Sequence, residues 1–253
     1  MYCFKKEDKH YGILFHDDFI YVLDMDISFN YYFGIRVLND KLDELVDALN
    51  QINSGIVSEA IVSEVIVSEV IVPEGSPIMK NGNNYNADIL IRRSNNMFSI
   101  LSGRQSGNNI ILESGGIITE CKVLPELIQA LKGVVTNGAF YAEYFIQPDY
   151  DSDNDLMYWI IVLKFDNCVV VLSLDSRNSV CGMSIPMTKI SDISKKLIKK
   201  YETHMKAILQ GINANTDFSL LKANGRGVVL LPSADSALFV AQTLIDIKDS
   251  QGP

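Results

Sequence analysis

Apolar residues recur along this chain with two different spacings, and the two spacings alternate. Short runs of aromatic and β-branched residues are typical of strands. They are followed by longer segments in which apolar residues recur every three or four positions, which is typical of an amphipathic helix. This order of strands and one helix occurs about four times. It predicts an α+β fold of tandem antiparallel β-meander and helix modules, with the helices covering one face of the sheets.

Each group of strands passes into its helix through a similar junction. Apolar strand residues give way there to Asn, Pro or Ser, which suit the start of a helix. We therefore expect Asn39 or Asp40 to cap the first helix, Pro125 to start the second and Ser233 to cap the last. The four junctions are Arg36–Asn39, Cys121–Pro125, Met183–Pro186 and Val229–Ser233.

The first two modules are predicted from their strands and helix stripes. In the first, Leu42, Leu45, Val46, Leu49 and Ile52 fall on one helical stripe. In the second, the helix runs from Pro125 through Val135 and ends at Asn137-Gly138. The predicted strands are 11–15, 19–24 and 31–38 in the first module, and 89–91, 97–101, 109–112 and 116–123 in the second.

The third module contains the most apolar strands of the chain. Residues 156–165 and 168–174 are nearly continuous apolar runs joined by Asp166-Asn167, a tight-turn signal. We expect them to pair antiparallel in the middle of the main sheet, buried on both faces, with helix 187–209 packed on one of them. Residues 140–146 are predicted as a strand and 149–155 as an acidic loop. The fourth module is a short hairpin, 218–221 and 227–231, before a final helix.

Residues 55–75 form a pentapeptide repeat unlike the rest of the chain, with Glu59, Glu64 and Glu69 in successive copies. A period of five matches neither a helix nor a strand, so no single face is apolar. One interpretation is a low-complexity linker. The other is an extended arm that pairs with an edge strand of a neighbouring subunit. The predicted organisation is a first module 1–54, this linker or arm 55–88, a second module 89–138, and third and fourth modules 139–253.

Composition restricts the class of protein. The chain has 253 residues, 47% of them hydrophobic, which is enough to bury a sizeable core. Its net charge is −9, so it is repelled by phosphate backbones unless its basic residues are grouped. The polar start of the chain and the absence of an apolar stretch of about 20 residues predict a cytoplasmic protein without membrane contact. The four cysteines, none in a CxxC pair, are expected to be reduced thiols.

The sequence contains no motif that predicts catalysis, and we expect no enzyme activity. G-x-S-x-G, Walker and G-x-G-x-x-G motifs are absent. The carboxylates are evenly spread, so no pair can be assigned to acid–base chemistry. His10, His16 and His204 lack neighbours at ligand spacing, so neither a metal nor a cofactor is expected. The Asp151–Asp155 segment begins like a calcium loop but has Leu156 where such a loop needs Gly, so it is interpreted as a solvated turn.

Basic residues are concentrated on the predicted helix 187–209. Lys189, Lys195, Lys196, Lys199, Lys200 and Lys206 lie there, opposed only by Asp192 and Glu202. Lys195 and Lys199 are four residues apart, as are Lys196 and Lys200, so each pair shares a helix face. Such a face either contacts phosphates or is simply solvated. The candidate nucleic-acid-binding residues are Lys195, Lys196, Lys199 and Lys200, with Arg92, Arg93 and Arg104 in the second module and Tyr31 and Tyr32 in the first.

The tyrosines are proposed as stacking platforms for bases. Tyr31, Tyr32 and Phe33 are consecutive, so at least one of them should point away from the core of a strand. The other tyrosines are interpreted mainly as core or sheet-pairing residues.

The tandem order of several antiparallel strands followed by one helix resembles the Whirly and purine-rich-element-binding families. The segment 89–135 resembles their module most, and 11–52 less completely. The resemblance implies helices packed behind a sheet that binds single-stranded nucleic acid, and paired repeats or subunits. It rests on the order of elements, because no residue string typical of those families is present. Module two also has few basic residues, Arg92, Arg93 and Arg104.

Two functions follow from these observations. The first is a non-catalytic single-stranded nucleic-acid-binding protein that uses sheet aromatics and the basic helix. The second is a non-catalytic assembly protein, for example in a viral or multi-subunit particle, that self-associates through the 55–75 arm. The expected partners are thus single-stranded nucleic acid or another protein subunit, in a homo-oligomer.

Overall fold

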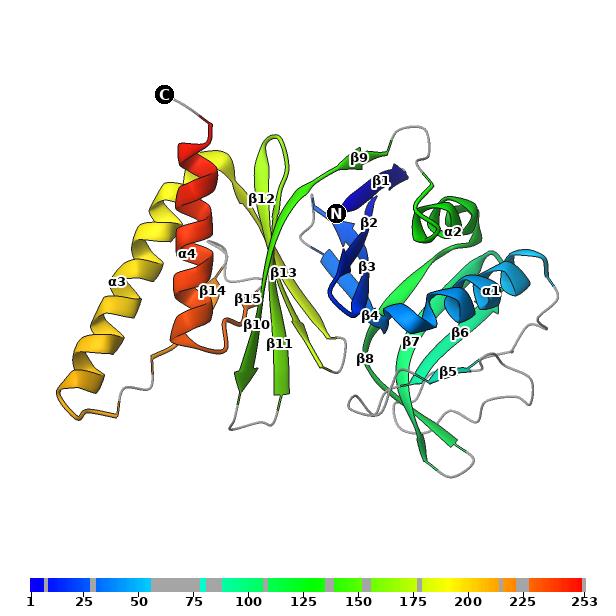
Figure 1. Ribbon diagram of the computed structural model, residues 1–253, viewed down its shortest axis with the longest axis horizontal. Helices are drawn as coiled ribbons and strands as arrows, with labels where there is room; N and C mark the ends of the chain where they lie inside the picture. The colour runs from blue at the N-terminus through cyan, green and yellow to red at the C-terminus, as the bar shows by residue number, and fades with distance from the viewer. Residues whose placement is uncertain are drawn as a thin grey trace. The chain divides into compact units, whose positions relative to one another are not determined.

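The structure is a computed structural model of the 253-residue chain, and it places helices and antiparallel sheets in the predicted order (Figure 1). It describes residues 1–6, 9–27, 31–55, 78–80, 88–106, 109–134, 139–151, 156–176, 179–213, 216–221 and 228–251. The predicted arm 55–75 lies outside this set except for Gly55, as does most of the Asp151–Asp155 loop. The fold class is α+β, as the sequence predicts, with meanders followed by helices.

The chain divides into two compact units. Unit 1 comprises Met1–Asp26, Phe33–Tyr141 and Arg177–Ser179, and unit 2 comprises Ile27–Tyr32, Ala142–Ser176 and Val180–Pro253. The two complete strand–helix modules that come first in the chain lie in unit 1, apart from the short segment at Ile27–Tyr32. The third and fourth modules lie in unit 2.

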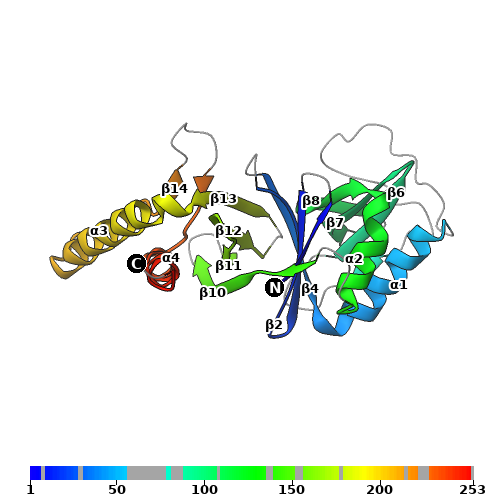
Figure 2. The same ribbon diagram turned by 90° about the horizontal axis from the view of Figure 1, so that it is seen from above.

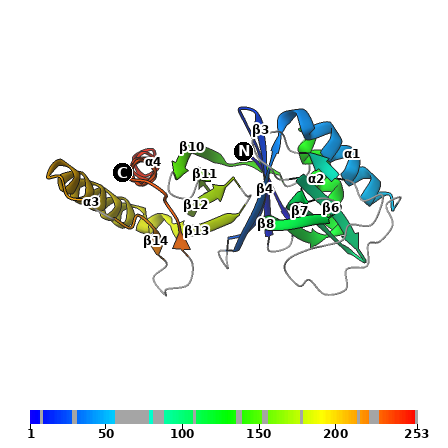
Figure 3. The ribbon, with the colours of Figure 1, turned by 90° about the horizontal axis from the view of Figure 1, so that it is seen from below.

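The described residues of unit 1 form two sheets and two helices. The first sheet has the order β4-β3-β2-β1-β9, and the second has the order β5-β6-β7-β8. Helices α1 (Leu42–Asn53) and α2 (Leu124–Leu131) lie side by side (Figure 3), and α1 contacts β6 of the second sheet whereas α2 contacts β2 of the first. The strands are β1 (Tyr2–Lys6), β2 (Lys9–His16), β3 (Phe19–Asp26), β4 (Tyr31–Leu38), β5 (Ile78–Lys80), β6 (Asp88–Ser94), β7 (Met97–Ser106), β8 (Asn109–Glu120) and β9 (Phe140–Tyr141).

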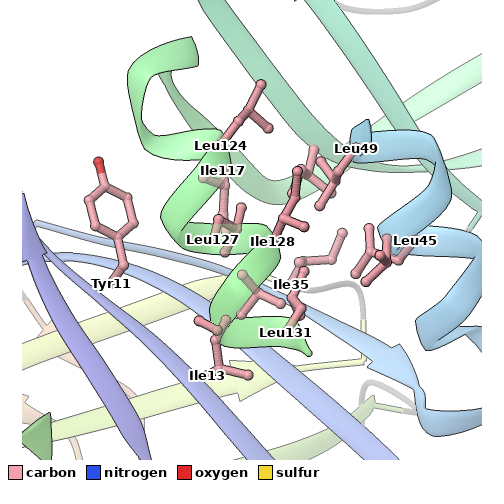
Figure 4. Close-up of a cluster of buried hydrophobic side chains, with 14 of the residues drawn as sticks. Tyr11, Ile13, Ile35, Leu45, Leu49, Ile117, Leu124, Leu127, Ile128 and Leu131 are labelled. Atoms are coloured by element: carbon pink, nitrogen blue, oxygen red, sulfur yellow. The ribbon is translucent and has the colours of Figure 1, made fainter. Parts of the chain in front are cut away.

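A single hydrophobic core joins both sheets of unit 1 to both helices. Figure 4 shows Leu127, Ile128 and Leu131 of α2 close to Leu45 and Leu49 of α1. The predicted stripe of α1 is confirmed, because Leu45, Leu49 and Ile52 are fully buried. The Tyr11 and Thr119 hydroxyls are 2.6 Å apart inside this core, which links β2 of the first module to β8 of the second.

Unit 2 repeats the meander once. Its sheet, the third, has the order β10-β11-β12-β13, and a two-stranded hairpin, β14–β15, precedes the last helix. Helices α3 (Ile190–Leu209) and α4 (Ala234–Asp249) pack along each other (Figure 2). The strands are β10 (Glu143–Asp151), β11 (Leu156–Lys164), β12 (Cys168–Asp175), β13 (Val180–Pro186), β14 (Leu220–Leu221) and β15 (Val228–Val229).

The central pair of the third sheet is confirmed. β11 and β12 pair antiparallel around Asp166-Asn167, with Ile161 opposite Leu172, and they are the two inner strands. Ile160 and Val169 pack with Ile190 and Leu197 of α3 in the core of unit 2. Ile161 and Val170 point to the other face and are also fully buried. The near-continuous apolar runs are therefore explained by burial on both faces.

Three modules begin their helix in the same way, which differs from the predicted caps. A three-residue 3-10 turn precedes α1, α2 and α3, and none of these helices has a side-chain cap. Instead, the first N–H of each turn donates to the hairpin between the second and third strands. The bonds are Asn39 N to Asp18 O (2.7 Å), Cys121 N to Asn96 O (2.6 Å) and Met187 N to Asn167 O (3.2 Å). The prediction for Ser233 is confirmed, because its Oγ accepts from Ser236 N.

Three predicted boundaries are wrong. α2 ends at Leu131 rather than near Val135, because Gly133 adopts a left-handed φ of 70° and a Schellman pair of bonds closes the helix, from Gly133 N to Ala130 O and from Val134 N to Gln129 O. Residues 109–112 and 116–120 belong to one strand, β8, paired with β7 across a bulge near Leu101. Residues 140–146 are split between β9 and β10, and β10 continues through Asp151, so the acidic loop is shorter than predicted.

Candidate nucleic-acid interface

The lysines of α3 all lie at the surface. Lys195, Lys196, Lys199 and Lys200 are exposed, as are Lys189 and Lys206. The opposite side of the helix holds Ile190, Ser194 and Leu197, which are buried. The structure therefore brings the four predicted lysines together on one helix, with their charged ends in solvent.

Most of these lysines are not engaged elsewhere. Lys200 Nζ donates to Asp217 O at 2.8 Å, which fixes its direction. Lys195, Lys196 and Lys199 make no hydrogen bond or ion pair within the described part of the chain. A polyanion could thus be bound by these three ammonium groups without breaking an existing ion pair.

The arginines of module two do not form a patch with one another. Arg92 and Arg93 are neighbours on β6, so their side chains lie on opposite faces of the second sheet. Arg92 is only 7% exposed. Arg93 Nη1 donates to Ile52 O at 2.9 Å, at the end of α1, and its Nε donates to Asn95 O. The side chain of Arg104 lies outside the described residues.

The aromatic triplet on β4 alternates as a strand should. Tyr31 is 60% exposed and Phe33 37%, whereas Tyr32 is 6% exposed. Tyr32 is therefore not accessible as a stacking platform, and Phe33 takes its place beside Tyr31. Tyr11 and Tyr21 are buried in the first sheet, as the sequence interpretation expected of most tyrosines.

An exposed apolar group at the end of α3 was not predicted. By its spacing from Leu197 and Tyr201, Ile208 continues the apolar stripe of α3, but it is 49% exposed, and Leu209 and Ile212 are 82% and 55% exposed. The stripe continues past the point where unit 2 covers it. The amphipathic pattern could not show this, because periodicity gives the side of the helix on which a residue lies. It does not show how far along the helix the rest of the unit packs against that side.

The remaining polar clusters are explained by structure. Asp149 Oδ2 accepts from Ser233 Oγ and from Ser236 Oγ, both at 2.5 Å, which fixes the start of α4 on β10. Burial raises the pKa of the Cys121 and Cys181 thiols, which disfavours the reactive thiolate. All four cysteines are free thiols. Within the described ranges, no three His, Cys, Asp or Glu side chains converge on a point where a metal ion could bind.

No protein-family model matches the chain, and no curated protein matches it. Within the described residues, none of the helices combines the length and the apolar character needed to cross a membrane. The resemblance to the Whirly and purine-rich-element-binding families stays a prediction that rests on the order of strands and helices.

Proposed function

We propose that this chain is a non-catalytic protein that binds single-stranded nucleic acid along the exposed face of α3. The observation that supports this most is the charge distribution. The segment 187–209 has six lysines and two acidic residues, a net charge of +4, so the rest of the chain has a net charge of −13. Positive charge on the surface is thus focused on one helix of an otherwise acidic protein, which orients a polyanion toward that helix.

The spacing of the lysines suits a phosphate backbone. Lys195, Lys199 and Lys206 follow one line of α3, because they are four and seven residues apart. At 1.5 Å per residue they span roughly 16 Å of the helix. Two or three phosphates of an extended strand fit in that length, so each lysine can contact its own phosphate.

Aromatic side chains on β4 suit unpaired bases. Tyr31 and Phe33 are exposed on the same side of an edge strand, two residues apart, which is roughly 7 Å. Bases of an extended strand stack on such rings regardless of sequence. A duplex keeps its bases paired and stacked, so this contribution favours single strands.

The experiment is a salt titration of oligonucleotide binding. Changing Lys195 and Lys199 to Gln should weaken binding of single-stranded DNA and lower the log–log salt slope by up to about 0.7 per lost contact. The matched control changes Lys6 and Lys122 to Gln, which removes the same charge from unit 1, where these lysines pair with Glu126 and Glu120. That control should change the affinity much less.

Two results would contradict the proposal. One is an equal effect of the two double variants, which would mean that only net charge matters. The other is unchanged affinity of the α3 variant at low salt, which would make the lysine face a solvated surface. Tyr31→Ala tests the aromatic contribution separately, because it should weaken single-strand binding without changing the salt slope.

Self-association is a second candidate, and the exposed end of α3 favours it. Ile208, Leu209 and Ile212 form an apolar group at the surface of unit 2. Leu209→Glu should lower the average mass in solution if this group is a subunit contact, and leave it unchanged if the chain is monomeric. The predicted contribution of the 55–75 arm lies outside the described residues and is tested by replacing it with a Gly/Ser linker.

A further inference from the structure

Arg92 is a buried cation whose hydrogen-bonding groups are not satisfied. Its side chain is 7% exposed, on the face of the second sheet opposite to Arg93. Neither Nε nor Nη2 has a hydrogen-bond partner, and among the described residues Arg92 forms no ion pair. Arg93, by contrast, donates from both Nε and Nη1 to backbone carbonyls. Two adjacent arginines on one strand are thus in opposite situations.

The two free groups lie on one edge of the guanidinium. Nε–H and one N–H of Nη2 point in the same direction, and this edge binds two oxygens of a carboxylate or phosphate through parallel bonds. The unsatisfied atoms are therefore a matched pair of donors for an oxyanion. A single orphaned atom would have no such specificity.

The surroundings make an unpaired charge at this position unfavourable. Burial lowers the pKa of Arg92, and no carboxylate of the described residues opposes that effect. The guanidinium nevertheless stays protonated at any ordinary pH. A buried charge without a partner is strongly destabilising, and buried polar groups in native proteins are almost always paired.

We propose that Arg92 is the anchor of an oxyanion-binding site on the second sheet, which takes a phosphate or carboxylate group through two parallel hydrogen bonds. Ser99 is the register partner of Arg92 on β7, and Ile118 is the partner of Ser99 on β8. The Ser99 side chain shares the face of Arg92 and offers a third donor. Ile118 is 57% exposed, so this row of the sheet opens to solvent at β8. The site is independent of α3 and of the function proposed for it.

The test measures thermal unfolding with and without inorganic phosphate. Arg92→Met keeps the length of the side chain and removes the unpaired charge. Without phosphate it should raise the unfolding temperature by about 5 °C, because an apolar residue replaces a desolvated cation. In the wild type, phosphate should raise the unfolding temperature further with each tenfold increase in concentration, and in Arg92→Met this rise should be lost.

Arg93→Met is the matched control on the next residue. It removes the bond to the end of α1, so it should lower the unfolding temperature and leave the increment due to phosphate intact. This comparison also removes the general stabilising effect of phosphate as a salt, which acts on all variants alike. Arg92→Lys keeps the charge but not the two-pronged edge, and should lose most of the phosphate increment.

Further arms identify the source of the oxyanion. Acetate and a short single-stranded oligonucleotide replace phosphate at equal ionic strength. A response to acetate alone assigns the site to a carboxylate, and a response to phosphate or oligonucleotide assigns it to a phosphate group. The oligonucleotide arm is run on the Lys195/Lys199 double Gln variant, so that oligonucleotide bound at α3 does not contribute to the measured stabilisation. Destabilisation by Arg92→Met, or equal increments in wild type and Arg92→Met for every anion, would overturn the proposal.

Discussion

Helices α1 and α3 follow the same kind of four-stranded meander, yet they end in different surroundings. The last apolar residue of α1, Ile52, is fully buried, and Arg93 from the second sheet donates to its carbonyl. α3 is 20 residues long against 12 in α1, and its last turn exposes Ile208 and Leu209. Unit 1 follows the first module with a complete second one, whereas unit 2 follows its module with only the β14–β15 hairpin and α4.

The difference shows which parts of a module are intrinsic. The 3-10 turn and its bond to the hairpin recur in all three complete modules, irrespective of what packs on them. The residues that cover the end of α1 come from the second module, so the end of α3 has no equivalent cover among the described residues. The apolar end of α3 is therefore exposed at the point where a second complete module would follow.

The largest expected effect is on the second sheet of unit 1. Gly116 has φ 146°, and a Cβ there would lie 2.5 Å from Ile100 O and 2.9 Å from Leu101 Cδ2. Gly116→Ala should destabilise unit 1 by about 4 kcal/mol, from backbone strain and overlap together. Calorimetric unfolding measures it. Trp159, the single tryptophan, lies in unit 2, so its fluorescence reports on that unit separately.

Gly133→Ala is the control for that prediction. Gly133 also has a positive φ, 70°, but no atom lies within 4 Å of its would-be Cβ. Only backbone strain remains, and the expected loss is about 1 kcal/mol. Equal losses for the two glycines would show that the close contact with β7 does not matter.

The second prediction compares the helix ends directly. Ile52→Ala removes a fully buried side chain and should cost about 3 kcal/mol. Ile208→Ala, at the corresponding end of α3, should cost less than about 1 kcal/mol, since half of that side chain is already in water. Urea unfolding of both variants measures the difference. A large loss for Ile208→Ala would mean that the end of α3 is covered in solution, for example by a second copy.

The sequence predicted the fold better than it predicted the boundaries. The spacing and type of the apolar residues predicted α1, α3, α4 and the central strands correctly. A helix buried along one stripe and a strand buried on both faces each give a recognisable sequence pattern. The end of α2 was missed, since Gly133, two residues after Leu131, ends the helix before the predicted Asn137-Gly138. The backbone bonds at Asn39, Cys121 and Met187 were also missed, because any residue can donate a main-chain N–H.

The candidate site was predicted in part, for a similar reason. The lysines of α3 were recognisable from helical spacing opposite an apolar stripe. The environments of Arg92 and Arg93 were not, because strand alternation shows that they face apart but not which of them finds an acceptor. Tyr32 was predicted as a platform beside Tyr31 and this was wrong, because alternation along β4 buries Tyr32 and exposes Phe33 instead.

The third prediction concerns the junction that differs from the other three. α4 begins at Ser233, whose Oγ accepts from Ser236 N at 3.1 Å and donates to Asp149. Ser233→Ala should destabilise unit 2 by about 1 kcal/mol, the usual value of an N-cap. Ser250→Ala, at the far end of the same helix, is the control and should change stability by less than about 0.5 kcal/mol. Trp159 fluorescence during urea unfolding measures both, and equal effects would count against the capping role.

The smallest effect expected is an opposite response of the two units to pH. Burial raises the pKa of Asp24 in unit 1, although Lys9 at 2.9 Å opposes it, whereas hydrogen bonds from Ser219 lower the pKa of Asp217 in unit 2. The Asp24 contribution is fully present below the unfolded-state pKa near 3.8 and is lost as pH rises through the raised folded value. The Asp217 contribution is present above 3.8 and is lost as pH falls through the lowered folded value.

Between pH 7 and pH 4, acid should therefore favour unit 1 through Asp24, and Asp24→Asn should remove that gain. Below pH 4, unit 2 should lose the Asp217 contribution, and Asp217→Asn should remove that loss. Hydrogen exchange of β3 and of residues 217–219 across this range follows each unit separately, and an unchanged pH profile in either variant would remove its carboxylate from the comparison.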